Sequence, residues 1–318
     1  MIKTHAQATE KYQFLGIVDK PKAGVTYKVR NLETGELEVL RTLPGAVRKD
    51  SETRERFLRE IRIHARLSHP NVVAFHDAWE LDGELVMTSE FVEGVSLASQ
   101  CAAGPLPVTD AVREICAVLS GLEEAHELGI VHRGITADHV TVTASGEVKL
   151  GGFGLAKPAC DVQLTQTGAI LGDPAYVSPE QVSGESAADI RSDLYSVGVL
   201  LYLALTGTVP FRGANEFDVL AAHLGSVPAP PSSINPAVAA ELDAVVVTAL
   251  AKRPAQRYAN ARQFRTALAS AVSVQTPRNE EARLPSPAAP RSRVALWCGG
   301  ALLLVIVWLV IHFLGVHA

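Results

Sequence analysis

The sequence of 318 residues has only four cysteines and no excess of basic charge. The cysteines, at positions 101, 116, 160 and 298, lack the spacing of a disulfide framework or a metal site, which favours a reduced cytosolic domain. With 29 basic against 34 acidic residues, nothing indicates a nucleic-acid partner. Residues 1–14 contain no apolar run, so we expect no secretory signal.

One long apolar segment does occur, near the C-terminus. Residues 294–311 carry no charge, and residues 313–316 extend the run past His312. At about 1.5 Å per residue a helix of this length covers roughly the 30 Å core of a bilayer, so we predict a transmembrane helix over 294–316. The alternative is a buried core helix, which rarely runs this long without a polar face.

Four arginines precede this segment, at positions 278, 283, 291 and 293, and only histidines follow. The positive-inside rule therefore keeps the bulk of the chain in the cytoplasm, on a single-pass anchor in the cell membrane. Between anchor and folded part, residues 271–293 contain several prolines and few apolar residues, which predicts a solvated linker. Residues 1–11 form an N-terminal tail, which leaves 12–270 as the folded domain.

The folded domain changes character along its length. Turn signals separate predicted strands at Tyr12–Val18, Gly24–Arg30, Leu37–Leu43, Val72–Ala78 and Glu84–Glu90. One helix, Ser51–Leu67, interrupts them. After Gly94 the periodicity is helical, with predicted helices from Thr109 to Gly129, at Leu194–Leu205, at Val238–Ala251 and at Asn260–Ala271. The sequence thus predicts an α+β protein with a small strand-rich lobe and a larger helical lobe.

Seven motifs occur in a fixed order along this domain. They are Glu60 in FLREIRI, SHPNVV at 68–73, VHRG at 131–134, GGFG at 151–154, GDPAYVSPEQ at 172–181, RSDLYSVGVLLY at 191–202 and KRPAQRY at 252–258. From Tyr12 to about Ser270 the chain resembles the bacterial Ser/Thr protein kinases of eukaryotic type. The resemblance implies a two-lobed protein-kinase fold.

The catalytic loop of that family resembles HRGITADH at 132–139, but its chemistry is changed. Gly134 replaces the aspartate that accepts the substrate proton, a base that typically contributes about 10²–10⁴-fold in rate. Thr136 replaces the lysine that steadies the transferred phosphate. His139 replaces the asparagine that ligates magnesium, and imidazole is a poor ligand for this hard cation. The loop therefore keeps His132 and Arg133 but lacks the side chains that would take part in phosphoryl transfer.

Two further positions continue this pattern. Gly152 stands where the family has the aspartate that holds magnesium, while Phe153, which packs, is retained. We therefore expect no metal site. Arg41 replaces the lysine that contacts the α- and β-phosphates, and its planar fork does not reproduce an ammonium group. An ion pair between Arg41 and Glu60 would be structural.

The nucleotide site is degenerate as a whole. In the glycine-rich loop only two glycines remain, too far apart to wrap phosphates, and Thr26 and Thr141 replace apolar residues that sandwich adenine in the family. The resemblance leaves residual nucleotide-binding positions at Gly16, Gly24, Arg41, Glu60, Glu90 and Val92. In the segment after GGFG, Thr165 and Thr167 are possible phosphorylation sites that Arg133 would bind. The alternative is an exposed loop without phosphorylation.

The residues that hold the kinase architecture are retained. By resemblance, Glu180 and Arg257 form the pair that ties the peptide-binding segment to the late helices. Asp193 bonds the catalytic-loop backbone from a buried helix. The structural set is His132, Arg133, Phe153, Glu180, Asp193 and Arg257. The catalytic and metal-binding side chains are lost, while the residues that hold the fold are retained, and this combination indicates a pseudokinase.

Three functions remain open at this stage. In the first, a membrane-anchored pseudokinase needs no cofactor and serves as a scaffold or allosteric partner of an active kinase or of an envelope or signalling protein. In the second, an unconventional Ser/Thr kinase uses ATP and Mg²⁺, with Asp138 or Asp173 as base and Asp161 as metal ligand. In the third, the cleft binds a nucleotide without turnover and acts as a switch.

Overall fold

The computed structural model describes residues 11–19, 25–43, 51–81, 84–155, 157–158, 173–184 and 188–273. Among these residues, no helix has both the length and the apolar character to cross a membrane. The expected span at 294–316 lies outside the described residues, as do Gly24, Asp161, Thr165 and Thr167.

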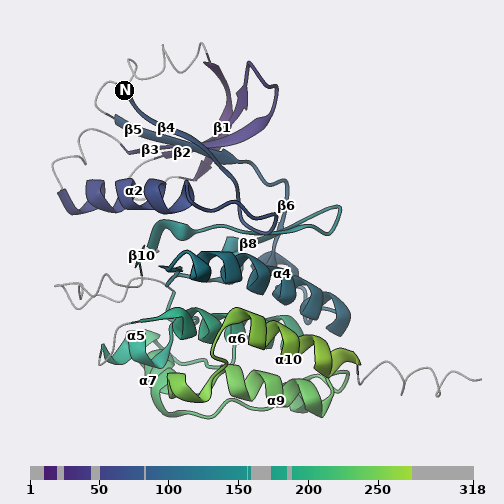
Figure 1. The fold of residues 1–318 in the computed structure, drawn as a ribbon. Coiled ribbons are helices and arrows are strands. Elements are labelled where there is room, and N and C mark those ends of the chain that lie inside the picture. The colour runs from purple at the N-terminus through teal and green to yellow at the C-terminus, as the bar shows by residue number, and fades with distance from the viewer. Residues whose placement is uncertain are drawn as a thin grey trace, which may run out of the picture. The chain divides into compact units, whose positions relative to one another are not determined.

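The N-terminal lobe is an antiparallel sheet of five strands, in the order β1-β2-β3-β5-β4 (Figure 1). The strands are β1 (Tyr12–Asp19), β2 (Val25–Asn31), β3 (Leu37–Leu43), β4 (Phe75–Leu81) and β5 (Glu84–Glu90). Asn31 forms the turn after β2, because its side-chain oxygen accepts the N–H groups of Glu33 and Thr34. Alternation along the strands then places apolar side chains on both faces of the sheet.

Each face of this sheet has its own apolar cluster. Tyr12, Val29, Leu40 and Val86 pack on one face. On the other face Leu43, Leu85 and Met87 pack against Phe57 of α2 (Ser51–His64). Helix α2 is therefore held to the sheet by apolar contacts on one side and presents its polar side to solvent.

The C-terminal lobe is mostly helical. It begins with β6 (Gly94–Ser96), α3 (Leu97–Cys101), α4 (Val108–Glu127), β7 (Ile130–Val131), η2 (Ala137–His139), β8 (Val140–Thr143), β9 (Val148–Leu150), η3 (Phe153–Leu155) and β10 (Lys157–Pro158). It continues with α5 (Pro179–Ser183), α6 (Ile190–Thr206), α7 (Glu216–Gly225), α8 (Pro231–Ile234), α9 (Ala240–Ala249), η4 (Pro254–Gln256) and α10 (Ala261–Ser273). Helix α6 is buried along nearly its whole length, with α4 and α9 packed on it and α10 against both of them (Figure 1).

Several predicted boundaries are wrong for local reasons. Thr109 lies inside α4, which begins after Pro107, and makes no capping bond. Strand β4 starts at Phe75, because Val72 forms a parallel bridge with Leu150 of the other lobe. Helix α10 continues to Ser273, so the expected linker starts later than residue 271. The cap at Asn260 is confirmed, since its side chain accepts the N–H of Gln263 at 2.9 Å.

Candidate active site

The loop 132–139 connects β7 to β8 and is held from below by one buried carboxylate. Asp193 of α6 accepts the backbone N–H of His132 at 2.9 Å and that of Arg133 at 2.8 Å. It also bonds the ring of His126 of α4 at 2.9 Å. Arg133 has φ of 63°, the left-handed region that side chains other than glycine rarely adopt. Because the carboxylate fixes both amides, the loop keeps this strained turn although residue 134 is glycine.

His132 is a structural residue of this loop. Burial lowers the pKa of His132 to about 4, so the ring is neutral. Its Nε2–H donates to the carbonyl of Gly151, and its Nδ1 accepts the N–H of Gly134. Both ring nitrogens are thereby used in joining the loop to the GGFG segment, and neither is available for chemistry.

The most informative contact in the site joins three of the altered positions. His139 Nδ1 donates to the carbonyl of Gly134 at 2.7 Å. The His139 ring also lies against Gly152, so that a Cβ added at Gly152 would come within 2.6 Å of three ring atoms. Real Cβ atoms do not approach heavy atoms so closely. The imidazole thus occupies the space that a side chain at position 152 would need.

Arg41 of β3 and Glu60 of α2 form the expected ion pair. Arg41 Nη1 lies 2.6 Å from Glu60 Oε1, and the guanidinium lies over the ring of Phe57. The Glu60 carboxylate is buried and lies against Gly154, where an added Cβ would be 3.2 Å from Oε2. The arginine therefore holds α2 in contact with both the sheet and the GGFG segment.

A column of four rings crosses from one lobe to the other. Phe75 of β4, His64 of α2, Phe153 and His132 follow one another, with centroid separations of 6.1, 5.7 and 4.5 Å. Burial lowers the pKa of His64, and its Nε2–H donates to the carbonyl of Val73 at 2.8 Å. The column assembles because α2 is held inward, and it links the sheet to the loop.

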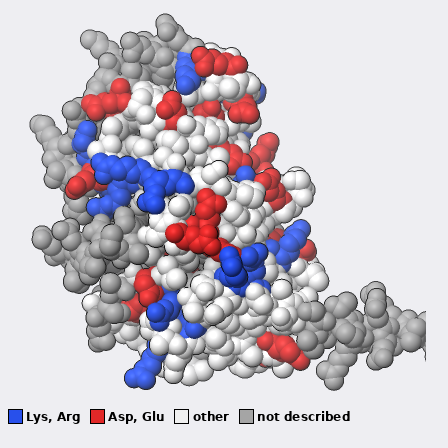
Figure 2. Space-filling view, in the orientation of Figure 1, with Lys and Arg blue, Asp and Glu red and all other residues white. Residues whose placement is uncertain are grey.

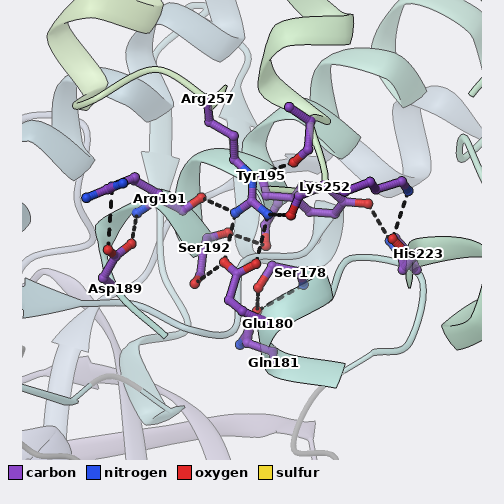
Figure 3. Close-up of polar contacts among 12 residues, drawn as sticks. Ser178, Glu180, Gln181, Asp189, Arg191, Ser192, Tyr195, His223, Lys252 and Arg257 are labelled. Carbon is purple, nitrogen blue, oxygen red and sulfur yellow. Dashed lines mark hydrogen bonds and ion pairs between the residues drawn. The ribbon is translucent and has the colours of Figure 1, made fainter. Parts of the chain in front are cut away.

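The segment 173–184 is fixed to the helical lobe by a bidentate ion pair (Figure 3). Arg257 Nη1 and Nη2 each lie 2.8 Å from one oxygen of Glu180, and Ser192 donates to the same carboxylate at 2.6 Å. The remaining N–H groups of Arg257 donate to the carbonyls of Ala251, Arg191 and Lys252. All five donors of a buried guanidinium are therefore satisfied.

A shallow pocket lies between the loop and this segment. Its lining includes Gly134, Thr136, Asp173 and Tyr176. Asp173 accepts the N–H of Ala175 at 2.9 Å, while Asp138 is exposed on η2. Asp173 and Gly134 thus face the same pocket, and among the described residues that line it Asp173 is the one carboxylate. Within the described residues, no three His, Cys, Asp or Glu side chains form a group that could hold a metal ion.

The other nucleotide positions are spread along the lobes. Gly16 lies on β1, opposite Lys28 of β2. Glu90 ends β5, and its carboxylate lies 3.1 Å from Lys149 of β9 and accepts the N–H of Ala74. Val92 lies two residues after the end of β5. The side chain of Glu90 is therefore engaged within the protein.

Two features were not found by sequence reasoning. The contact of His139 with Gly152 was missed because each position was compared only with its own family residue. The signal that would have shown this contact is the pairing of a large ring at His139 with the loss of a side chain at Gly152. The ring column was missed because His64 lies outside the family motifs.

The chain and its fold are similar to known proteins. The family model described as "Protein kinase domain" matches residues 12–268. Ser/Thr-protein kinase PknJ of Mycobacterium tuberculosis is 37% identical over 255 residues, covering 78% of this chain and 43% of PknJ. PknB of Mycobacterium leprae is 33% identical over 280 residues, covering 86% of this chain and 45% of PknB. The crystal structure of the M. tuberculosis PknI kinase domain matches with a TM-score of 0.63 at 28% identity, over 82% of this chain and 96% of that chain.

The chain is therefore a protein of the two-lobed kinase fold, with a β-sheet lobe and a helical lobe. It belongs to the protein kinase family, among the bacterial Ser/Thr kinases of eukaryotic type. It spans less than half the length of the PknJ and PknB relatives that it matches.

Proposed function

We propose that this chain is a pseudokinase that is anchored in the cell membrane and acts as a scaffold or allosteric partner in signalling. The observation that carries the proposal is the position of the His139 ring. It fills the space beside Gly152 and is bonded to Gly134, so three of the altered positions form one packed unit. A site that had merely lost a carboxylate would leave this space open.

Mg²⁺ does not fit the residues present. This ion requires near-octahedral oxygen ligands, usually one or two carboxylates with phosphates and water. Positions 134 and 152 supply no side-chain oxygen, and position 139 supplies an imidazole nitrogen. The residues that would position a metal-bound triphosphate beside an activated hydroxyl are thus missing, and we derive no phosphoryl-transfer step.

The frame that remains is suited to binding a protein. The Arg41–Glu60 pair, the ring column and the Glu180–Arg257 pair are all formed, so α2 and the segment 173–184 have defined positions. Figure 2 shows basic side chains gathered over α2, where the sequence contributes Arg54, Arg56, Arg59 and Arg62. Charges of both signs alternate over the helical lobe (Figure 2). A basic surface on a firmly placed helix suits a partner with an acidic face.

The anchor belongs to the same proposal. The apolar residues 294–316 would confine the domain to the membrane surface and raise its effective concentration toward membrane-bound partners, such as an active kinase or an envelope protein. A variant that ends at residue 293 should leave the membrane fraction of lysed cells, while the full chain stays in it. Recovery of both forms in the membrane fraction would contradict the anchor.

Radiolabelled ATP tests the absence of phosphotransfer. The full chain, purified in detergent, is incubated with ATP and Mg²⁺ or Mn²⁺ and with a mixture of Ser- and Thr-containing peptides. We expect no transfer to peptide or to the chain. The double variant Asp138→Asn, Asp173→Asn is the control, because Asp138 lies on the same loop as Gly134 and Asp173 lines the same pocket. Label that appears with the natural chain and vanishes in this variant would establish an unconventional kinase instead.

A further inference from the structure

Helix α7 presents its apolar side chains to solvent. All ten of its residues are described, and the one side chain among them that is buried is that of His223. Phe217 is 81% exposed and Leu224 is 45% exposed. Residues at i, i+4 and i+7 share one face of a helix, so Phe217, Ala221 and Leu224 form an exposed apolar row, the α7 stripe. Val227, just beyond the helix, extends this row and is 85% exposed.

Polar contacts hold the inner side of α7. The Nδ1 atom of His223 lies 2.8 Å from the hydroxyl of Tyr195 on α6. Lys252 donates from Nζ to the carbonyls of Ala222 at 3.2 Å and His223 at 2.7 Å (Figure 3). Phe211 packs edge-on against the His223 ring. The helix therefore cannot turn its apolar stripe inward without breaking these bonds around a buried histidine.

Such a row of apolar side chains differs from the scattered ones that every protein surface carries. Single exposed apolar residues need no explanation, whereas a contiguous apolar surface marks a site of interaction. Because the inner contacts fix the orientation of α7, the stripe is displayed in one position. A partner can therefore bury it without reordering the helix.

The two ends of α7 carry opposite charge. At the first turn, the carboxylates of Glu216 and Asp218 outnumber the guanidinium of Arg212, which precedes them. At the last turn, the ammonium group of Lys252 lies on the helix carbonyls, and the exposed Arg253 follows it directly in the chain. An acidic end, an apolar middle and a basic end make a surface that is complementary to itself when two copies lie antiparallel.

We propose that the α7 stripe is a self-association surface, on which α7 of a second copy of this chain lies antiparallel about a two-fold axis close to Ala221. Phe217 of each copy packs on Leu224 of the other, and Glu216 of each copy faces Arg253 of the other. The contact is isologous, so it closes with two copies. This inference goes beyond the proposed pseudokinase function and does not depend on whether phosphate is transferred.

The charges favour a second copy over a lipid surface as the occupant. The cytoplasmic surface of a membrane is negative and would repel the acidic end of α7, whereas a second copy supplies the opposite charge at each end. With ten residues the helix is about 15 Å long, so it supplies only part of the roughly 800 Å² per partner that stable interfaces bury. We therefore expect a reversible association that increases with the concentration of the chain.

Site-directed crosslinking of the full chain tests this surface. In a chain that carries Cys160→Ser and Cys298→Ser, the change Ala221→Cys places one thiol of each copy beside the two-fold axis. The thiols of Cys101 and Cys116 are buried and half-buried. A short bis-maleimide should link two copies of this variant, in membranes and in detergent at high protein concentration. The matched control is Ala144→Cys, an exposed position on the turn between β8 and β9, which should not be linked.

Equal crosslinking at positions 221 and 144, or none at position 221, would overturn the proposal. A thiol at position 221 that is protected from a water-soluble maleimide, without crosslinking, would show that a lipid surface or a different protein covers the stripe. That result would overturn the second copy as the occupant. Phosphotransfer and membrane fractionation are measured separately, so failure of this proposal is distinguishable from failure of the proposed function.

Two kinds of substitution then test the packing. Phe217→Ser should lower the crosslinked fraction about tenfold or more, because each copy loses its largest contact, and its exposed position leaves the fold intact. Glu216→Arg and Arg253→Glu should each lower the crosslinked fraction about two- to fivefold, and the two changes together should restore it. Unchanged crosslinking of the Phe217→Ser variant would overturn the stripe as the contact. Failure of the combined charge reversal to restore crosslinking would overturn the antiparallel arrangement.

Discussion

Adding a single methyl group at Gly152 should destabilise the domain well beyond the size of the change. Gly152 has φ of +79°, where a side chain costs about 1–2 kcal/mol. The new Cβ would also lie within 2.6 Å of His139 ring atoms, and forcing such overpacking costs typically about 1–3 kcal/mol. Gly152→Ala should therefore lower the free energy of unfolding by about 2–5 kcal/mol. For a domain of this size each kcal/mol shifts the melting temperature by roughly 2–4 °C.

The same change in a second background isolates the contact. His139→Ala removes the ring, so Gly152→Ala in that background should cost only the backbone strain, about 1–2 kcal/mol. The difference between the two backgrounds is the coupling energy of ring and glycine. Thermal unfolding of the full chain, followed by tryptophan fluorescence, measures all four forms. Gly225→Ala is the control, since a Cβ there meets no atom within 4 Å. An equal cost of Gly152→Ala in both backgrounds would refute the reasoning.

Two further predictions concern stability. Glu180→Gln leaves the buried charge of Arg257 without its partner and should lower the free energy of unfolding by about 3–5 kcal/mol. The control, Glu241→Gln on the exposed face of α9, should change the melting temperature little. Similar shifts in melting temperature for the two variants would argue against the role of the pair. Burial lowers the pKa of His132 and of His223 to about 4 from 6.5. Because the unfolded chain then binds more protons below pH 6.5, stability present at neutral pH is lost as the pH falls from 6.5 toward 4, by up to about 3 kcal/mol for each ring. Melting temperatures measured from pH 7.5 to 4.5 check this, and a flat profile would contradict it.

Much of the frame could be predicted from the sequence, because it depends on local patterns and ordered motifs. Alternation gave the strands of the small lobe, and the continuous apolar run gave α6. The Arg41–Glu60 and Glu180–Arg257 pairs were expected from matched motif positions and are present. In these cases the partners are fixed by the fold, so identity at two positions suffices to place them together.

The packing inside the cleft could not be predicted in the same way. The contact between His139 and Gly152 depends on the rotamer of the ring and on the backbone conformation at Gly152. Motif spacing in the sequence specifies neither of these. The start of β4 was also missed, since Val72 pairs with a strand distant in sequence. Short helices such as α3 and α8 carry too few residues for a periodic signal. Tertiary contacts decide each of these features.

The ring column has a thermodynamic consequence for the two surfaces that it joins. His64 sits on the helix whose outer face carries the basic residues, while His132 and Phe153 border the loop that ends at His139. A protein that displaces α2 on binding would therefore disturb the ring stacking and move the loop 132–139 with it. Whatever free energy that protein spends on displacing the loop, a change imposed on the loop returns to the affinity of α2 for the protein, because coupling is reciprocal.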